Sequence, residues 1–568
     1  MGRVKVLPPD IISKIAAGEV IERPASVIKE LAENSLDSGA TSLEVHLKGA
    51  GKACIRVKDN GSGIERDDLE KIFSRHCTSK ISSLQDLFSI GSLGFRGEAL
   101  YSISAVSDVI LRSRTASSDS GWEIHQRGQE KISLKPVSTA AGTEIEIKEL
   151  FFNTPARKKF LKSDAAELHQ ALNTFLPYCI LYPRIRFLFS NNNKPLIDLR
   201  EAKDHVERAS AALNLKPANM IESRGEIAQN QIKLHVILGD INIQRARRDM
   251  QFIFVNGRPV QNRAISFNVN EALKLILPPH VSGFFAVYID MPREDLDVNI
   301  HPSKREVKMK GESAIAGFLR SFCARALMDS SKPKQAAAPS QSPIPKTYVL
   351  NDARIPDEVK ESVPAQYFID QNYSRPVQPE ATLKHKLTAA CYIGPLMNKY
   401  LLYQAGDSLL VVDQHAAQER ISYELLKKQL AAQAVESQHL LSPVILRLTP
   451  QEMVVWEIVH ARVEKIGLVT TLWDKESIAL HTHPKIINDP QTAVRNLLDI
   501  DEHSHFDDDM LARRACRNSL MTGYVMAPEQ AGYLCRQLNA CDDPFTCPHG
   551  RPTVIEISDG FLEKQFLR

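Results

Sequence analysis

Apolar residues in the first part of the chain recur with both helical and strand spacing. Residues 26–37 carry them at helical spacing and Gly39 follows, so this segment is predicted to be an amphipathic helix. Residues 43–47 and 54–58 alternate between apolar and polar side chains, as does the segment 143–150, which is typical of strands with one buried face. These patterns predict an α/β (α+β) arrangement in the N-terminal region.

Residues 205–330 repeat this mixture as a second α/β region. Two apolar segments, 252–256 and 282–289, flank the helix-like segment 264–277. A strand, a helix and a second strand in this order predict a β-α-β crossover, and such crossovers are right-handed in nearly all proteins.

The composition changes after residue 330. Residues 331–345 are rich in proline, serine, alanine and glutamine and have no apolar periodicity. Such a segment cannot bury enough apolar surface to offset the entropy lost on ordering, so residues 331–385 are predicted to be a disordered linker.

The C-terminal region, residues 386–568, is predicted to be a further α/β unit. Residues 401–404 and 408–413 are expected to form a β-hairpin, and residues 418–429 are expected to be helical. Residues 445–505 are expected to form a small subdomain inserted into this unit.

Length, charge and cysteine content exclude several classes of protein. The chain has 568 residues, too many for one hydrophobic core, which favours about three or four domains. Its formal net charge of +3 is nearly balanced, so any surface for nucleic acid must be local. It has no apolar run of about 18 residues and no apolar signal-peptide core, so no membrane partner is expected. Nine cysteines, an odd number, favour reduced thiols in the cytoplasm.

Glu30 and Asn34 are the first candidates for chemistry. They lie four residues apart in the predicted helix and therefore share one of its faces. A carboxylate beside a carboxamide suits a base that activates water next to a ligand for magnesium, which takes few protein oxygens and shares its shell with water and phosphate. A solvated helix face would show the same spacing.

Turns and glycines follow the predicted strands. Asp59 stands at the end of the strand over 54–58, and Gly61 belongs to the turn signal after it. Glycines recur between residues 91 and 97, just before a helix predicted to begin at Glu98. Glycines let backbone N–H groups approach an anion, and a helix N-terminus favours negative charge, so this segment has the features of a phosphate-binding loop.

Taken together, these motifs resemble the ATP-binding fold shared by gyrases, heat-shock chaperones, histidine kinases and the MutL mismatch-repair proteins. The resemblance is closest to the MutL family, and the further segments that carry it are 14–20, 94–100, 153–160 and 297–304. It implies an ATPase sandwich of the Bergerat type over residues 1–204, a second domain over residues 205–330, and a C-terminal dimerisation and endonuclease domain after the linker.

The resemblance also implies roles for individual residues of an ATP and Mg²⁺ site. Glu30 would polarise the attacking water, Asn34 would bind the magnesium, and Asp59 would accept a hydrogen bond from the adenine amino group. Lys304 would reach the γ-phosphate from the second domain. The other implied nucleotide contacts are Gly61, Gly63, Thr78, Leu93, Gly94, Phe95, Arg96, Gly97 and Thr143.

A second group of candidate residues lies in the C-terminal region. Asp413, His415 and Glu419 span the end of a predicted strand and the first helical turns after it. Their side chains are ligand types for a transition metal, although a polar helix N-terminus capped by Asp413 would look the same. The donors that would complete a site for one or two metal ions are Cys516, Cys547 and His549.

These residues resemble the DQHA-x2-E-x4-E, ACR and CPHGRP motifs of the MutL proteins that nick DNA. The resemblance implies metal-dependent hydrolysis of the DNA backbone, with Asp413 and Glu419 as catalytic carboxylates and with Zn²⁺ and/or Mn²⁺ as the metal. The other implied ligands are His415, Cys516, Cys547 and His549.

Short basic clusters are candidates for DNA contacts. One contains Arg157, and another lies at residues 245–248. Arg258 and Arg263 flank a Pro-Val pair, and Arg263 aligns with an arginine that the MutL family uses on DNA. We expect such arginines to contact phosphates, which makes binding independent of base sequence and sensitive to salt.

Further partners follow from short motifs and from the resemblance. Gln438, Leu441 and Pro443 fit the Q-x-x-L-x-P pattern by which some MutL proteins dock on the replication sliding clamp. The resemblance also implies a homodimer, in which the apolar stretch 552–557 is suited to packing between subunits. DNA and the mismatch-recognition protein MutS are the other implied partners.

The leading hypothesis is therefore a mismatch-repair ATPase with a C-terminal nicking endonuclease. The alternative is an ATP-driven matchmaker or clamp without nuclease activity, in which the C-terminal residues hold structural zinc. A third hypothesis is a chaperone-like or topoisomerase-like relative. The topoisomerase-like version fits poorly, because no stretch indicates a domain with a catalytic tyrosine and the N-terminal motifs resemble those of MutL most closely.

Overall fold

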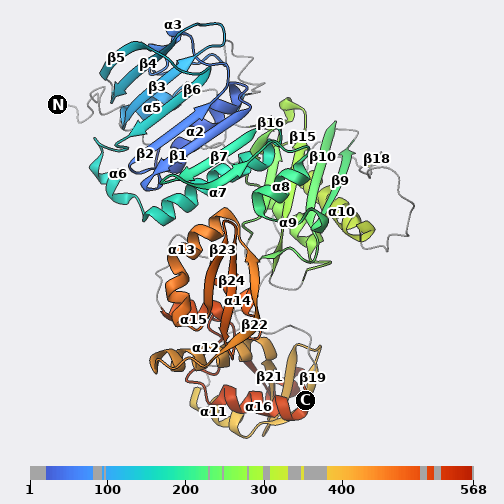
Figure 1. Cartoon of the computed structure of the whole chain (residues 1–568). Helices are drawn as coiled ribbons and strands as arrows, with labels where there is room; N and C mark the ends of the chain where they lie inside the picture. Colours follow the sequence, from blue (N-terminus) through green and yellow to red (C-terminus); the bar gives the residue numbers. More distant parts are fainter. Residues whose placement is uncertain are drawn as a thin grey trace, which may run out of the picture. The chain divides into compact units, whose positions relative to one another are not determined.

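The computed structural model describes residues 21–80, 92–94, 97–128, 130–227, 231–245, 248–277, 281–297, 307–330, 347–350, 380–498, 508–516 and 526–565. The chain divides into two compact units, one of residues 1–358 with 449–454 and the other of residues 359–448 with 455–568. Figure 1 labels many of the elements of both units. Among the helices of these described segments, none is long and apolar enough to cross a membrane.

The first unit contains an eight-stranded sheet in the order β5-β4-β3-β6-β2-β1-β7-β8 (Figure 1). Neighbouring strands are antiparallel, except that β1 and β7 run parallel. The strands are β1 (Ser42–Lys48), β2 (Cys54–Asp59), β3 (Asp108–Arg114), β4 (Gly121–Arg127), β5 (Glu130–Val137), β6 (Gly142–Lys148), β7 (Arg186–Asn191) and β8 (Lys194–Leu199). The strands expected over residues 43–47, 54–58 and 143–150 are confirmed as β1, β2 and β6, although β6 ends at Lys148, before the expected residue 150.

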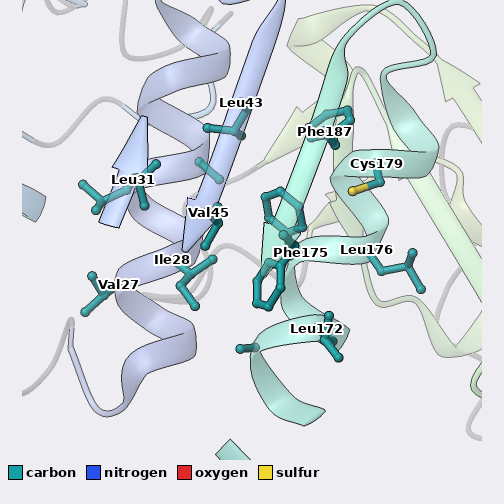
Figure 2. Packing of buried hydrophobic residues seen from close by; sticks show 14 of the residues in the cluster. Val27, Ile28, Leu31, Leu43, Val45, Leu172, Phe175, Leu176, Cys179 and Phe187 are labelled. Atoms are coloured by element: carbon teal, nitrogen blue, oxygen red, sulfur yellow. The ribbon is translucent and has the colours of Figure 1, made fainter. Parts of the chain in front are cut away.

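Two helices, α2 (Pro24–Asp37) and α7 (Asp164–Leu181), pack together and bury apolar side chains against this sheet (Figure 2). Proline stands at the first position of α2, where its missing N–H removes no helical hydrogen bond. Gly39 follows the helix with a φ of +75°, so the expected helix over residues 26–37 is confirmed. The residues labelled in Figure 2 are Val27, Ile28, Leu31, Leu43, Val45, Leu172, Phe175, Leu176, Cys179 and Phe187.

Shorter helices complete this part of the first unit, and a second sheet follows them. The helices are α3 (Arg66–Leu69), α5 (Ala99–Ala105), α6 (Pro155–Phe160) and α8 (His205–Leu213), with 3-10 turns at Gly49–Gly51, Pro217–Asn219 and Arg293–Asp295. The second sheet has the order β13-β12-β15-β10-β9-β18. Its strands are β9 (Met220–Ile227), β10 (Ile232–Gly239), β12 (Gln251–Val255), β13 (Arg258–Val260), β15 (Phe285–Asp290) and β18 (Thr347–Leu350).

The β-α-β unit expected in this region is present. Strands β12 and β15 are parallel neighbours, and α9 (Arg263–Leu273) connects them in sequence. The helix ends before the expected residue 277. The strand expected over 282–289 is divided into β14 (Ser282–Gly283), which pairs with β11 (Gln244–Arg245), and β15.

A long helix and three short strands complete the described part of this region. Helix α10 (Glu312–Ser330) packs against α9, and β16 (Leu296–Asp297) pairs with β17 (Lys308–Met309). Inside the expected linker, β18 adds to the second sheet parallel to β9. Helix α11 (Glu380–Thr388) begins before the expected end of the linker at residue 385.

The second unit contains an antiparallel sheet in the order β19-β20-β21-β25. The hairpin expected around residues 405–407 is confirmed as β20 and β21, and the helix expected over 418–429 is confirmed as α12. The elements are β19 (Cys391–Leu396), β20 (Tyr400–Ala405), β21 (Ser408–Asp413), α12 (Gln414–Ala431), α15 (Asp508–Ala515), α16 (Pro528–Asn539), β25 (Val554–Ser558) and α17 (Asp559–Gln565).

The two faces of this sheet differ in burial. Leu401, Leu410 and Val412 are buried in a core that includes residues of α12 and α16. The alternate positions of the central strands are only half-buried although several are apolar, and Ile555 on β25 is 55% exposed. One face of the sheet therefore presents an apolar surface within the second unit.

A separate three-stranded sheet lies between α12 and α15 in sequence, in the order β22-β24-β23. Its first strand begins at Ser437, ahead of the expected start of the inserted subdomain at residue 445. The elements are β22 (Ser437–Arg447), α13 (Pro450–Lys465), β23 (Val469–Asp474), β24 (Ser477–Pro484) and α14 (Pro490–Leu498).

Candidate ATP site and candidate metal centre

Helix α2 brings the first group of candidate residues to one place. The Asn34 Oδ1 atom accepts a hydrogen bond of 2.9 Å from the Lys80 ammonium, which also forms an ion pair of 2.6 Å with Asp37. The Asp37 carboxylate accepts hydrogen bonds from the backbone N–H groups of Leu93 (2.8 Å) and Gly94 (2.9 Å). Two oxygens of α2 thus already hold one cation beside the glycine-containing segment.

Glu30 lies one turn before Asn34, beside a buried polar chain. Its carboxylate is 3.3 Å from the Lys29 ammonium, which lies 3.0 Å from the Glu33 carboxylate. The Tyr178 hydroxyl of α7 donates a hydrogen bond of 2.6 Å to Glu33. Burial lowers the pKa of Lys29, but the carboxylates of Glu30 and Glu33 outweigh this effect and the pKa is raised, so Lys29 stays charged.

Asp59, at the end of β2, is surrounded by donors. Its carboxylate accepts hydrogen bonds from the Ser35 hydroxyl (2.7 Å) and from the backbone N–H groups of Gly61 (2.9 Å) and Thr143 (3.3 Å). Burial raises the pKa of Asp59, and these hydrogen bonds only partly oppose the rise. A buried carboxylate of this kind is strongly directional, because any group that meets it must be a hydrogen-bond donor.

Two of the predicted glycines are required by contacts within the protein. Gly63 has a φ of +73°, and a Cβ atom there would lie 2.3 Å from the Arg114 carbonyl oxygen. Gly97 has a φ of +62°, and its Cβ would lie 2.5 Å from the Cys77 carbonyl oxygen. Both positions therefore exclude any side chain on steric grounds alone.

The remaining predicted nucleotide contacts are only partly described. The Thr78 hydroxyl accepts a hydrogen bond of 3.2 Å from the Lys80 backbone N–H, and the Thr143 hydroxyl pairs with Ser113 at 3.0 Å. Phe95, Arg96 and Lys304 lie outside the residues that the structure describes.

The C-terminal candidates gather around Glu419. One donor atom from each of Glu419, Cys547 and His549 lies within 4.8 Å of the other two. The Glu419 carboxylate is 3.3 Å from His549 Nδ1 and 3.2 Å from His415 Nε2, although its side chain is only 4% exposed. A buried carboxylate, a thiol sulfur and two imidazoles form a donor set that fits a transition metal such as zinc.

Cys516 and Asp413 are related to this cluster in different ways. Cys516 follows α15 and is buried; burial, with a smaller effect of Glu419, raises the pKa of its thiol to about 12. A metal would therefore have to displace its proton. Asp413 is not part of the cluster formed by Glu419, Cys547 and His549. Its Oδ1 atom accepts hydrogen bonds of 2.9 Å from the backbone N–H groups of His415 and Ala416. It is the N-cap of α12.

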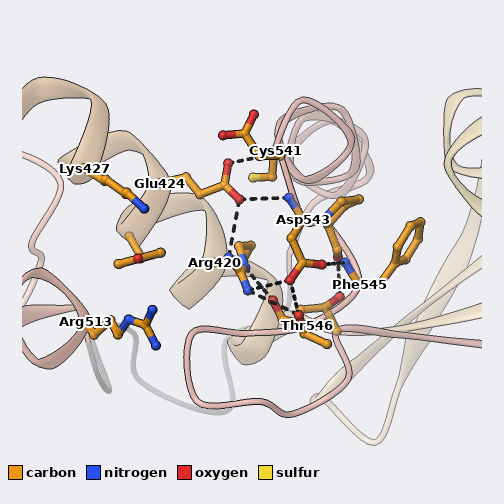
Figure 3. A network of polar contacts seen from close by, with 12 residues as sticks. Arg420, Glu424, Lys427, Arg513, Cys541, Asp543, Phe545 and Thr546 are labelled. Atoms are coloured by element: carbon orange, nitrogen blue, oxygen red, sulfur yellow. Dashed lines mark hydrogen bonds and ion pairs between the residues drawn. The ribbon is translucent and has the colours of Figure 1, made fainter. Parts of the chain in front are cut away.

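A polar network fixes the loop before Cys547 to α12 (Figure 3). The Glu424 carboxylate accepts hydrogen bonds from the backbone N–H groups of Asp542 (2.7 Å) and Asp543 (3.2 Å). The Arg420 guanidinium donates to the Asp543 carboxylate at 3.0 Å and to the Thr546 carbonyl oxygen. Since Arg420 and Glu424 are themselves buried, this network holds the loop in one position relative to Glu419.

The predicted DNA residues differ in exposure. Arg263 is exposed at the first position of α9, and Arg157 is half-buried in α6 with its Nη1 atom lacking a hydrogen-bond partner among the described residues. The expectation for Arg258 was wrong, because this side chain is 5% exposed and donates to backbone carbonyl oxygens inside the unit. A buried guanidinium of this kind has no surface for DNA.

The Q-x-x-L-x-P segment lies in β22. The register with β24 shifts between His439 and Val444, and Leu441 in this interval is fully exposed. The Gln438 amide nitrogen lies 2.8 Å from His483 Nε2, so its side chain is held against the sheet.

Several residues that shape these sites were given no individual role in the sequence-based prediction, although Glu424 is the last residue of the DQHA-x2-E-x4-E motif. Asp37 and Lys80 connect α2 to the glycine-containing segment, and Arg420 and Glu424 hold the loop before Cys547. One signal was available for the second pair. Arg420 follows Glu419 directly, and its spacing of four residues from Glu424 places both on one face of α12.

Three protein families match successive parts of the chain. Residues 21–151 match the family described as histidine kinase-, DNA gyrase B- and HSP90-like ATPase. Residues 216–328 match the C-terminal domain of DNA mismatch repair protein, and residues 393–525 match the MutL C terminal dimerisation domain. The expected mixed α/β fold, with an ATPase-type N-terminal domain, is therefore confirmed.

Proteins of the same family are similar along their whole length. The DNA mismatch repair proteins MutL of Koribacter versatilis, Endomicrobium trichonymphae and Exiguobacterium sp. are 31%, 33% and 33% identical to this chain, and each alignment covers 100% of both sequences. Full coverage at this identity excludes a match confined to the ATPase domain. The chain belongs to the MutL family of DNA mismatch repair proteins.

Proposed function

We propose that this MutL-family ATPase couples ATP-driven conformational change to mismatch processing and carries a metal-dependent DNA-nicking endonuclease in its C-terminal unit. The domains would be the ATP-binding domain at 1–204, the second α/β domain at 205–330, the linker at 331–385 and the dimerisation and endonuclease domain at 386–568, with an insertion at 445–505. The clustering of Glu419, Cys547 and His549 within 4.8 Å is the observation that carries the nuclease half of the proposal.

In the ATP half, Glu30 is the base for the attacking water and Asn34 is the protein ligand of Mg²⁺. The Asn34 Oδ1 atom and the Asp37 carboxylate already bind the Lys80 ammonium, which supports their fitness for a cation. The Asp59 carboxylate accepts a hydrogen bond from the adenine amino group. Guanine has a carbonyl oxygen at this position, which would leave the carboxylate without a donor. The other nucleotide contacts proposed are Gly61, Gly63, Thr78, Leu93, Gly94, Phe95, Arg96, Gly97, Thr143 and Lys304.

In the nuclease half, Glu419 is the central ligand, and a bound metal would supply Lewis acidity and an activated water. Cys547 is held in a tight turn, in which the Arg551 N–H points to its sulfur at 3.4 Å and Gly550 has a φ of +82°. An N–H group directed at the sulfur favours a thiolate ligand. The remaining metal residues of the proposal are Asp413, His415, Cys516 and His549.

The apolar face of the β19-β20-β21-β25 sheet supports a homodimer. Leu402, Val411 and Ile555 are aligned across three strands of this face, and none of them is fully buried. A second copy of the chain would cover the face symmetrically. This assignment agrees with the match of residues 393–525 to a dimerisation domain.

DNA, MutS and the sliding clamp are the remaining partners proposed. Arg263 places a cation at the first position of α9, where the helix dipole makes it unfavourable unless an anion such as a phosphate is bound. The Nη1 atom of Arg157, which has no hydrogen-bond partner among the described residues, is suited to the same role. For the clamp, the exposed Leu441 supports docking, with Gln438 and Pro443 beside it.

One experiment tests both halves on the same protein. ATP hydrolysis and nicking of supercoiled plasmid are measured under three conditions: with Mn²⁺, with a chelator, and after Mn²⁺ is added back to the chelated protein. Bound metal is quantified on each sample. We expect chelation to abolish nicking and addition of Mn²⁺ to restore it. ATP hydrolysis without nicking under all of these conditions would favour the alternative function, an ATP-dependent matchmaker with structural zinc.

The Asp59→Asn variant is expected to be more stable than the wild type without nucleotide and to lose affinity for ATP. Because burial raises the pKa of Asp59, the folded chain holds this proton to a higher pH than the unfolded chain. The free energy of unfolding therefore falls as the pH rises through this window, and asparagine removes that loss. The NH2 group of the introduced amide and the adenine amino group are both hydrogen-bond donors and cannot pair with each other. The affinity for ATP should therefore fall at least about tenfold.

Thermal unfolding at neutral pH, with and without ATP, measures both effects. We expect a higher Tm for Asp59→Asn in the absence of nucleotide and a much smaller ATP-induced rise. A variant that ATP stabilises as strongly as the wild type would contradict the assignment of Asp59 to adenine.

The Ile555→Lys variant is expected to dissociate the dimer. A symmetric interface would contain this lysine twice, without a partner charge, so the dimer dissociation constant should rise at least about 100-fold. Leu472→Lys is the matched control, because Leu472 is also an apolar strand residue with 55% exposure but lies in the other sheet of the unit. Analytical ultracentrifugation of the full chain measures the change; equal effects of both variants would place the interface elsewhere.

A further inference from the structure

Arg258 joins the second sheet of the first unit to the segment 92–94. It is the first residue of β13 and is 5% exposed. Its Nη1 atom donates a hydrogen bond of 3.0 Å to the Leu93 carbonyl oxygen, and its Nη2 atom donates to the Ser92 carbonyl oxygen. One guanidinium therefore binds two consecutive peptide carbonyls, which a planar fork of donors does well and an ammonium does poorly.

The same segment is held from its other side by α2. The backbone N–H groups of Leu93 and Gly94 donate to the two oxygens of Asp37, at 2.8 and 2.9 Å. The carbonyls thus point to Arg258 and the amides to Asp37, so the backbone of 92–94 is fixed in both position and orientation. The glycine-containing segment proposed to bind phosphates continues directly from it.

Arg258 itself is anchored by a tight hairpin. Asn256 and Gly257, between β12 and β13, have φ angles of +47° and +75°, the signature of a two-residue turn that matches the twist of its strands. The Asn256 side chain exchanges two hydrogen bonds with the backbone of Met291, at 2.8 and 2.9 Å. The Tyr182 hydroxyl donates a hydrogen bond of 3.1 Å to the Gly257 carbonyl oxygen.

Among the residues that the structure describes, carboxylates balance the charge of Arg258 from a distance rather than through a direct ion pair. Burial lowers the pKa of Arg258, and the nearby carboxylates of Glu33 and Asp37 oppose this shift, so the guanidinium remains charged. Hydrogen bonds from a charged donor to carbonyls are stronger than neutral ones, so loss of the guanidinium fork weakens the hold on this segment.

We propose that Arg258 is a positioning residue for the phosphate chain of ATP, acting from the second α/β domain through the carbonyls of Ser92 and Leu93. The inference rests on the proposed ATP site. It adds the contact of Arg258 with Ser92 and Leu93, which depends on the position of the β12-β13 hairpin of the second domain. Among the described residues, Arg258 forms its hydrogen bonds with Ser92 and Leu93, and neither Asp59 nor Glu30 is a partner. We therefore expect its effect on the β- and γ-phosphates, which ATP has and AMP lacks.

The test compares the affinities of the full chain for ATP and for AMP. In Arg258→Lys the charge is retained but the fork is lost, so we expect the dissociation constant of ATP to rise about tenfold. The dissociation constant of AMP should be almost unchanged, because Asp59 and Thr143 are intact. Calorimetry gives the ATP value and ligand-observed NMR gives the AMP value. Arg224→Lys is the matched control, since Arg224 belongs to the same sheet but is exposed.

Each outcome has one meaning. Equal weakening of ATP and AMP would show a general loss of structure and overturn the inference, and so would unchanged affinity for both. If Arg258→Lys does not fold, Tyr182→Phe loosens the same hairpin by one hydrogen bond, and the same selective loss for ATP, smaller in size, decides the question. Failure of the wild type to bind ATP would instead overturn the proposed function.

Discussion

Glu30→Gln is expected to reduce ATP turnover by about 10²–10⁴-fold, the usual contribution of a general base, while ATP binding persists. Glutamine keeps the size of the side chain but cannot take the proton of the attacking water. Asn34 and Asp59 are untouched, so the contacts proposed for magnesium and adenine remain. The fold is also retained, since the apolar side of α2 does not include Glu30.

Two measurements on the same samples establish this result. Phosphate release gives the turnover, and calorimetry gives the dissociation constant of ATP. Glu70→Gln is the control, because Glu70 is an exposed glutamate of the same unit, paired with Lys131 at 3.3 Å. A Glu30→Gln protein that hydrolyses ATP at the control rate would remove Glu30 from the role of base.

Glu419→Gln is expected to remove the bound metal and, with it, DNA nicking. Changes in residues that only orient a metal ligand cost about 10–100-fold in affinity, so loss of the central carboxylate should exceed about 100-fold. The carboxylate lies between His415 and His549, and an amide would bring a competing donor to the same place. Metal content after dialysis and nicking of supercoiled plasmid with Mn²⁺ are the two readouts.

Glu436→Gln is the matched control, because Glu436 is an exposed glutamate of the same unit. Asp413→Asn adds a variant that keeps the helix cap, since asparagine also caps helix N-termini well. We expect it to lose nicking and to keep ATP hydrolysis. If Glu419→Gln loses its metal and the C-terminal unit unfolds, the structural-zinc alternative is favoured; full nicking without metal would contradict both readings.

The local elements were predictable because their physical causes are local. The helix at 24–37 follows from apolar spacing and from Gly39, and the parallel β12 and β15 follow from a helix placed between two apolar strands. Pairings between distant segments leave no such pattern. Nothing in the alternation of β1 indicates that its parallel neighbour is β7.

In the candidate sites too, local features were predictable and contacts between distant segments were not. Glu419 and His415 share a helix face by their spacing, so their proximity was foreseeable from the sequence, whereas the approach of His549 depends on a loop held by Arg420 and Glu424. Arg258 was misassigned because charge alone favours the surface. Its burial depends on two carbonyl acceptors, and a sequence does not show where backbone carbonyls will face.

The parallel pairing of β1 with β7 also has a consequence for biosynthesis. Strand β1 becomes internal to its sheet only when residues 186–191 have left the ribosome, long after α2 and β1 themselves. Until then the nascent chain presents a strand edge that can pair with another chain, and α2 lacks its neighbour α7. Translation pauses that keep residues 186–199 inside the ribosome would lengthen this aggregation-prone interval, whereas pauses after these residues have emerged would find all eight strands available for pairing.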